Sequence, residues 1–194
     1  MALRSALFLF IVFLVPLGCN RAKAPGKASP DQNTQMEITP QLTMSPVRVQ
    51  FFGETGLEWE MDAPEAKGVS RSDILSARNL TINLFEGGIK STKITADEGF
   101  INSGTTIWAP GSMLPLNGGD MFLHGHVVVS STEPARLTTD WINYRKSRGV
   151  IVSTAPVELI RGKTETKGNG LEATPDLRSV KIFNETLVIH GEEN

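Results

Sequence analysis

The feature of this sequence that most restricts its fold is an alternation of apolar and polar side chains with a period of two residues. The clearest stretches are rich in valine, isoleucine, threonine and phenylalanine, and they span residues 47–51, 80–84, 121–129 and 157–159. This period is typical of strands that have one face in a core and the other in water. Only residues 70–77 could form a helical turn. The pattern therefore predicts an all-β domain of many short strands.

Turn-forming residues separate these stretches. Glycine or proline, often with asparagine or aspartate, occurs at residues 86–88, 117–120, 132–134, 147–149, 161–162 and 168–170. This spacing favours a barrel, a sandwich, a jellyroll or a solenoid. A weak repeat adds to it: ITAD at 94–97 returns as LTTD at 137–140, and TETKGNGL at 164–171 is a degraded third copy. Repeated strand–turn–strand units stack into an elongated structure in which neighbours cover each other's apolar faces.

The same alternation assigns side chains to an interior. The inward candidates are Leu80, Ile82, Leu84, Leu123, Val127, Val129, Val157 and Leu159. These side chains could line an open apolar trough, or they could fill a closed core. Phe122, His124, His126 and Val128 fall on the opposite face.

The polar residues give no sign of an enzyme. His124 and His126 share a strand face, but a zinc site needs three or four ligands, and the only other histidine is His190. No Gly-x-Ser-x-Gly elbow occurs, and Asp97 and Asp140 of the repeat are expected to be polar residues at strand ends. We expect no catalytic residue, no metal and no cofactor. The net charge of −2 argues against a nucleic-acid partner.

The N-terminus has the pattern of a targeting segment. Arg4 precedes an apolar run at residues 6–18, which is shorter than the roughly 20 residues that span a membrane and is typical of a signal peptide. Gly18 and the lone Cys19 resemble the lipobox of bacterial lipoproteins, although Pro16 departs from it. We therefore expect a signal peptide or short anchor at residues 1–18, with lipidation at Cys19. A flexible tether is expected at 19–35 and the folded domain at 36–194.

The ordered strands of the domain are similar to those of the LptC family, the membrane-anchored periplasmic component of the lipopolysaccharide export machine. The resemblance is carried by GHVVV at 125–129, LTTDWINY at 137–144, IVSTAPV at 151–157 and GNGL at 168–171, preceded by WEMDA at 59–63. Each stretch is a generic strand or turn, but their order and spacing together are specific. The match covers the chain from about residue 47 to residue 190.

This resemblance implies an open, twisted antiparallel β-jellyroll that holds the acyl chains of lipopolysaccharide in an apolar interior. It also implies a non-enzymatic role at the periplasmic side of the inner membrane. The lipid would arrive from an ABC transporter and leave to a soluble periplasmic bridge protein of the same fold. The family often has a transmembrane helix, whereas this chain has a short apolar run that ends at Cys19.

An open jellyroll leaves two edge strands whose backbone groups can pair with a partner strand. The resemblance assigns residues 44–52 to the transporter's periplasmic domains and residues 180–190 to the bridge protein. Pro46 has no N–H group, which suits an edge or a strand start. Alternation along the second edge predicts one continuous strand, with Val180, Ile182, Asn184, Thr186 and Val188 on one face.

Two alternatives stay open. A freestanding periplasmic or outer-membrane lipoprotein of the same fold could bind another lipid or act only as a scaffold. Asn20 after Cys19 favours an outer-membrane address in the enteric sorting code. The second alternative is a jellyroll enzyme of the cupin type, which would carry bound metal after purification.

Overall fold

The computed structural model describes residues 40–69, 74–104, 106–112 and 114–189. Strands dominate this part of the chain, and the predicted all-β class is confirmed. The elements are β1 (Pro40–Met44), β2 (Val47–Gly53), β3 (Gly56–Ala63), β4 (Glu65–Val69), β5 (Ile74–Glu86), β6 (Ile89–Asn102), β7 (Met121–Ser131), β8 (Ala135–Arg145), the 3-10 helix η1 (Lys146–Arg148), β9 (Val150–Arg161), β10 (Thr164–Ala173), β11 (Val180–Ile182) and β12 (Thr186–Ile189). The helical turn expected within 70–77 is wrong from residue 74 onward, because β5 begins there.

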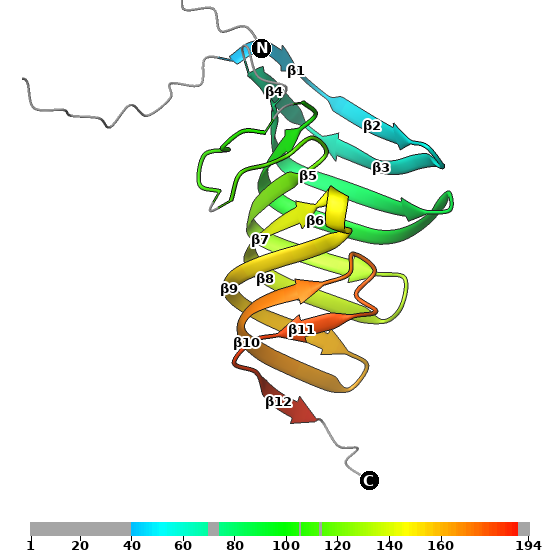
Figure 1. Cartoon of the computed structure of the whole chain (residues 1–194), viewed down its shortest axis with the longest axis vertical. Helices are drawn as coiled ribbons and strands as arrows, with labels where there is room; N and C mark the ends of the chain where they lie inside the picture. Colours follow the sequence, from blue (N-terminus) through cyan, green and yellow to red (C-terminus); the bar gives the residue numbers. More distant parts are fainter. Residues whose placement is uncertain (1–39, 70–73, 105, 113, 190–194) are drawn as a thin grey trace, which may run out of the picture. The chain divides into compact units, whose positions relative to one another are not determined.

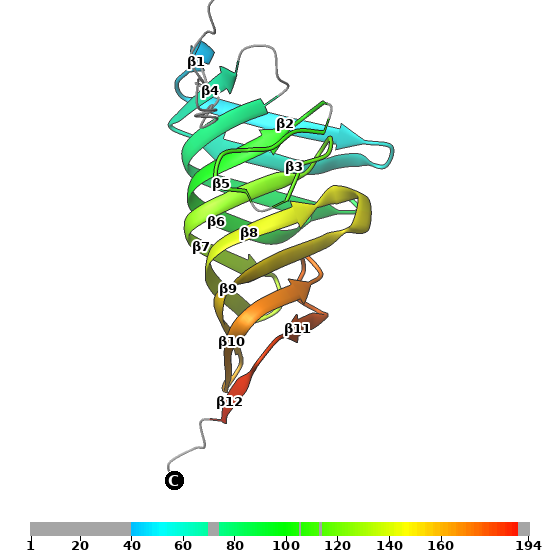
Figure 2. The ribbon, with the colours of Figure 1, turned by 60° about the vertical axis from the view of Figure 1, so that its left-hand side comes forward.

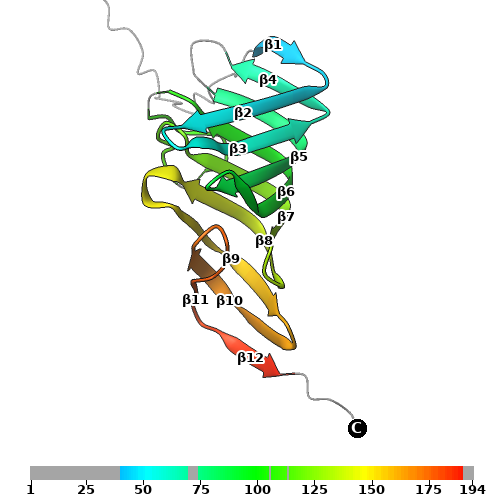
Figure 3. The ribbon, with the colours of Figure 1, turned by 90° about the vertical axis from the view of Figure 1, so that its right-hand side faces the viewer.

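The strands form one antiparallel sheet (Figure 1). Strands β5 to β10 pair in succession. Before them, β4 pairs with the first half of β5 and β3 with its second half, while β1 pairs with β4 and β2 with β3. After them, β12 and β11 pair with the two halves of β10. The sheet is therefore a meander in which the outermost strands on both sides are divided in two (Figure 3).

The long strands are interrupted near their middles, and the interruptions lie next to one another across the sheet. Asn79 in β5, with φ of 50°, stands opposite Asp97 in β6. The pairing of β7 shifts at residues 125–126 against both of its neighbours, and both residues have positive φ. The next shifts follow between β8 and β9 and at Gly170 in β10. We call this row of bulges the bend line, because bulges kink and twist strands.

The breaks between the divided outer strands also lie on the bend line. Pro46 separates β1 from β2, and Pro64 separates β3 from β4. Ser45 joins the two breaks by donating a hydrogen bond from its hydroxyl to the Pro64 carbonyl at 2.8 Å. At the other side of the sheet, Asn184, with φ of 49°, lies between β11 and β12. The single strand predicted over 180–190 is therefore two short strands with a break at the bend line.

The bend line folds the sheet into two halves around a common interior (Figure 2). The first half contains β2, β3, β12 and the segments of β5 to β10 that pair alongside them, and the second half contains β1, β4, β11 and the remaining segments. In β6 the interior residues are Ile94 and Ala96 before the bend line and Ile101 after it. The alternation thus changes phase at the bend, which keeps apolar side chains inside on both halves.

The apolar side chains form two clusters. The large interior cluster draws on both halves, from Trp59 and Met61 in β3 to Ile182 in β11. A smaller cluster lies on the outer face of the second half, where Ile107, Ala109 and Leu116 of the β6–β7 connection pack with Phe100 and Phe122. Phe122 therefore faces outward as predicted by alternation, yet it is buried.

Two predictions from the sequence are wrong at positions on the bend line. Asp97 and Asp140 of the weak repeat lie inside β6 and β8 at the bend line, so the expectation that they end strands is wrong. Residues 168–170, predicted as a turn, lie inside β10, where Gly170 has φ of 87°. Gly170 provides the positive φ at a bulge instead of reversing the chain.

Candidate functional site

The structure brings the predicted interior residues together. All eight belong to the large interior cluster, and each is at most 8% exposed: Leu80, Ile82, Leu84, Leu123, Val127, Val129, Val157 and Leu159. Leu123 comes from the second half and the other seven from the first half. Their shared interior position follows from the fold, and their binding of lipid remains a prediction.

Sequence reasoning missed most of the interior surface of the second half. Met121, Ile142, Ile151 and Leu171 are at most 1% exposed and face the same interior. Ile142 lies beyond the bend line in β8, where a single alternation phase carried across the bulge points to the wrong face. Leu171 directly follows the residues predicted as a turn. Met121 shares the parity of Leu123, and that parity is the signal that could have found it.

We call one side of the fold the seam: it lies opposite the bend line, where strand ends of the two halves meet. A cavity of about 420 Å³ opens there between the halves. It is lined by Glu58, Leu84, Phe85, Glu86 and Ser91 of the first half and by Tyr144, Lys146, Thr174, Pro175 and Asp176 of the second half. Leu84 belongs to the interior cluster, so the cavity borders the apolar interior.

One end of the seam is closed by Lys146 of η1. Its ammonium lies 3.0 Å from a carboxylate oxygen of Glu58 and 3.9 Å from the centre of the Phe51 ring, which stacks on Trp59. Beside it, burial and the nearby carboxylate of Glu58 raise the pKa of the Tyr144 phenol. Tyr144 therefore stays neutral and adds an uncharged wall to the cavity.

Both edges of the sheet carry unpaired strand sides among the described residues. β1 and β2 pair only with β4 and β3, and β11 and β12 pair only with β10. Exposed apolar side chains lie at both edges: Leu42 is 58% exposed on β1, Phe52 is 64% exposed on β2, and Phe183 is 41% exposed after β11. Unpaired backbone and exposed apolar groups together are suited to an added strand.

The backbone of β11 has a defined orientation. The N–H of Phe183 donates to the Gly170 carbonyl at 3.0 Å, and the carbonyl of Ser179 accepts from the N–H of Thr174 at 2.8 Å. Because backbone groups alternate along a strand, those of residues 179, 181 and 183 face β10. The N–H groups of Val180 and Ile182 therefore point away from the sheet, toward the free side.

The two histidines of β7 do not converge on one site. His124 stacks on Phe122 and lies 3.4 Å from a carboxylate oxygen of Glu98. His126 lies at the bulge, 91% exposed, with its Nδ1 2.6 Å from a carboxylate oxygen of Asp97. That hydrogen bond and the charge of Asp97 raise the pKa of His126. The described part of the chain contains no group of three or more histidine, cysteine, aspartate or glutamate residues placed to hold a metal.

Cys19, the apolar run before it and the expected tether lie outside the described residues. In the part that the structure describes, no helix is long and apolar enough to cross a membrane.

Solved structures with the same architecture define the class of this protein. It is similar to the crystal structure of LptH from Pseudomonas aeruginosa, described as the LptA-homologous periplasmic component of the conserved lipopolysaccharide transport device. The similarity has a TM-score of 0.53 at 12% sequence identity and covers 69% of this chain and 95% of LptH. No curated protein matches the chain. The fold is thus an open antiparallel jellyroll of the LptA type.

The model of the family described as "Lipopolysaccharide-assembly, LptC-related" matches residues 7–108 and 114–188. The chain belongs to the LptC family. This membership confirms the resemblance noted in the sequence and gives the protein a role in lipopolysaccharide transport. The family is associated with the periplasm and the inner membrane, and its members are transport components.

Proposed function

We propose that this protein binds the acyl chains of lipopolysaccharide between the two halves of its jellyroll and passes the lipid from an inner-membrane ABC transporter to an LptA-like bridge protein. The observation that carries the proposal is the interior cluster, which draws apolar side chains from both halves, from β3 to β11, and includes Leu84 at the seam. An apolar trough is sufficient for this task, because each buried CH₂ group contributes about 0.8 kcal/mol.

The two edges of the sheet give the transfer a direction. We propose that β1 and β2 receive the periplasmic domains of the transporter and that β11 and β12 receive the bridge protein. Strand addition on both sides would join the three interiors into one apolar path. The edge residues proposed for the bridge protein are Val180, Ile182, Asn184, Thr186 and Val188, of which Asn184 lies in the break between the two strands.

A photo-crosslinking residue at Leu159 should capture lipopolysaccharide in membranes that contain the transporter and ATP. Glu158 is the matched control, because it precedes Leu159 in β9 and its side chain is 40% exposed on the opposite face, 3.9 Å from Lys167. We expect capture at position 159 only. Equal capture at both positions would contradict the interior as the binding site. Absence of capture at either position would favour the scaffold function.

We further propose that the domain is held at the inner membrane through its N-terminus, with Cys19 as the lipidated residue. Mass spectrometry of the mature protein should find a diacylglyceryl-modified Cys19 as the first residue. Cys19→Ala should abolish this modification and leave an uncleaved or released protein. An unmodified Cys19, or a different first residue, would contradict lipidation. The N-terminus would then be a short anchor or a signal peptide removed by ordinary cleavage.

A further inference from the structure

The loop between β10 and β11, residues 174–179, crosses the seam and inserts a side chain into the interior. Leu177 is 1% exposed and belongs to the interior cluster. Its φ is 58°, in the left-handed region that a leucine adopts only when its surroundings hold it there. The loop thus closes the interior at the seam with an apolar plug.

The loop is internally braced, so it can move as a unit. The hydroxyl of Thr174 donates to a carboxylate oxygen of Asp176 at 2.6 Å, and the N–H of Arg178 donates to the same oxygen at 3.0 Å. The N–H of Leu177 donates to the Thr174 carbonyl at 2.9 Å, and the N–H of Ser179 donates to the Thr174 hydroxyl at 3.0 Å. These bonds brace the loop from within.

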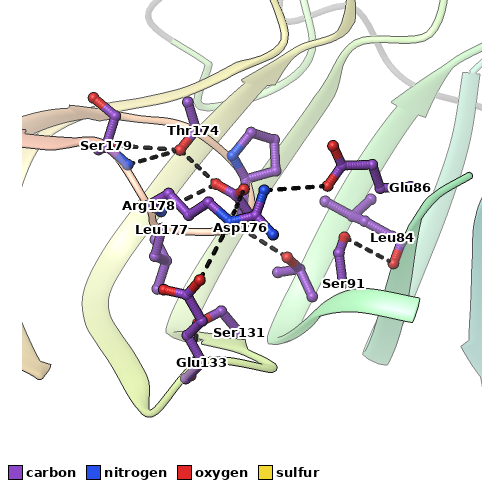
Figure 4. Close-up of polar contacts among 12 residues, drawn as sticks. Leu84, Glu86, Ser91, Ser131, Glu133, Thr174, Asp176, Leu177, Arg178 and Ser179 are labelled. Carbon is purple, nitrogen blue, oxygen red and sulfur yellow. Dashed lines mark hydrogen bonds and ion pairs between the residues drawn. The ribbon is translucent and has the colours of Figure 1, made fainter. Parts of the chain in front are cut away.

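Polar contacts fasten the loop to the first half (Figure 4). The Arg178 guanidinium lies 3.3 Å from Glu133 in the β7–β8 turn and 3.9 Å from Glu86 at the end of β5. The hydroxyl of Thr92 donates to the Pro175 carbonyl at 2.9 Å, and Arg161 donates to the Leu177 carbonyl. Every one of these partners belongs to the first half, whereas the loop is continuous with β10 and β11 of the second half.

Two of these fastenings, the ion pairs of Arg178, are weak because they are exposed. Arg178 is 61% exposed, and its partners Glu86 and Glu133 are 68% and 58% exposed, so water and salt screen both ion pairs. The cavity at the seam is lined by Thr174, Pro175 and Asp176 of the same loop and borders the interior at Leu84. An alkyl chain that enters there meets Leu177 and can replace its apolar contacts.

We propose that the 174–179 loop is the gate through which acyl chains enter the interior, with Leu177 as the plug and Arg178 as the clasp that sets how readily the gate opens. The inference rests on the proposed binding of lipopolysaccharide between the two halves. On this account the clasp controls the rate of loading, since the interior is filled by the protein's own side chains until the loop lifts away from Glu86 and Glu133.

The first test reverses the charge of the clasp in the full chain. In membranes with transporter and ATP, Arg178→Glu should raise the initial rate of lipopolysaccharide capture by the photo-crosslinker at Leu159 about three- to tenfold, because the attractions to Glu86 and Glu133 become repulsions, as does the 3.2 Å ion pair with Asp176 inside the loop. The matched control is Arg148→Glu. Arg148 is also 61% exposed, and it pairs with Glu172 within the second half at 3.2 Å. This control should leave the rate unchanged.

The second test locks the gate reversibly. Arg178→Cys with Glu133→Cys, joined by a disulfide-containing bis-maleimide, should lower capture at least tenfold, and reductant should restore it. The same reagent on Arg148→Cys with Glu172→Cys should have no effect, because both residues lie in the second half. Normal capture by the locked protein would overturn the gate and leave the proposed function standing. No capture by the wild-type protein would overturn both.

Discussion

Val180→Pro should weaken docking of the LptA-like bridge protein by more than tenfold while the domain stays folded. The N–H of Val180 points away from β10, so proline removes a donor that only an added partner strand could use. One backbone hydrogen bond contributes about 1 kcal/mol net, and the proline ring also clashes with the docked strand. Together they exceed the 1.4 kcal/mol that corresponds to a tenfold change in affinity.

Affinity for the purified bridge protein measures the effect, and circular dichroism and thermal unfolding follow the fold. We expect the melting temperature of Val180→Pro to stay within a few degrees of wild type. Lys181→Pro is the matched control, because the N–H of residue 181 faces β10 and its loss breaks the native sheet. Unchanged binding by Val180→Pro would mean that the bridge protein docks on another surface.

Asp120→Ala should lower the free energy of unfolding by about 3–5 kcal/mol. Asp120 is 1% exposed, and one of its carboxylate oxygens lies 2.9 Å from the Arg145 guanidinium. The same carboxylate accepts hydrogen bonds from the N–H groups of Asn117 and Lys146, both at 3.0 Å. Removing it leaves the mostly buried charge of Arg145 and two backbone donors without their partner. Urea denaturation of the full chain measures the loss.

An exposed ion pair provides the control for this prediction. Arg48 and Asp62 are only 2.6 Å apart, but their side chains are 64% and 38% exposed. Asp62→Ala should therefore change the free energy of unfolding by no more than about 1 kcal/mol. If the two variants lost the same stability, burial would not determine the contribution of Asp120.

Alternation located the strands because it reports directly which side chains face a core. It placed Leu80, Ile82 and Leu84 correctly in the interior, since they lie on one side of the bend line. It could not place Ile142, because the phase changes between Thr139 and Ile142, and a bulge has no unique sequence signal. The glycines of residues 168–170 were misread for the same reason: glycine permits positive φ in a turn and in a bulge alike.

The seam was beyond the reach of sequence patterns. Arg178 meets Glu86 and Glu133 only because the sheet folds back on itself, and their separations along the chain follow no period. Nothing in the sequence distinguishes Leu177 as a buried plug from an exposed loop leucine. The two edges were easier to predict, since in a meander the first and last strands are the ones without a second neighbour.

The bend line limits how this chain can change in length. On each side of it, a strand must keep a fixed number of residues between its bulge and the next turn. One inserted or deleted residue there would send every side chain beyond it to the opposite face, and the apolar set would turn toward water. We therefore expect insertions to be tolerated at the tips of the hairpins, such as residues 87–88 and 162. These are the places to add epitope tags or fluorescent labels, and the places where related sequences are free to differ in length.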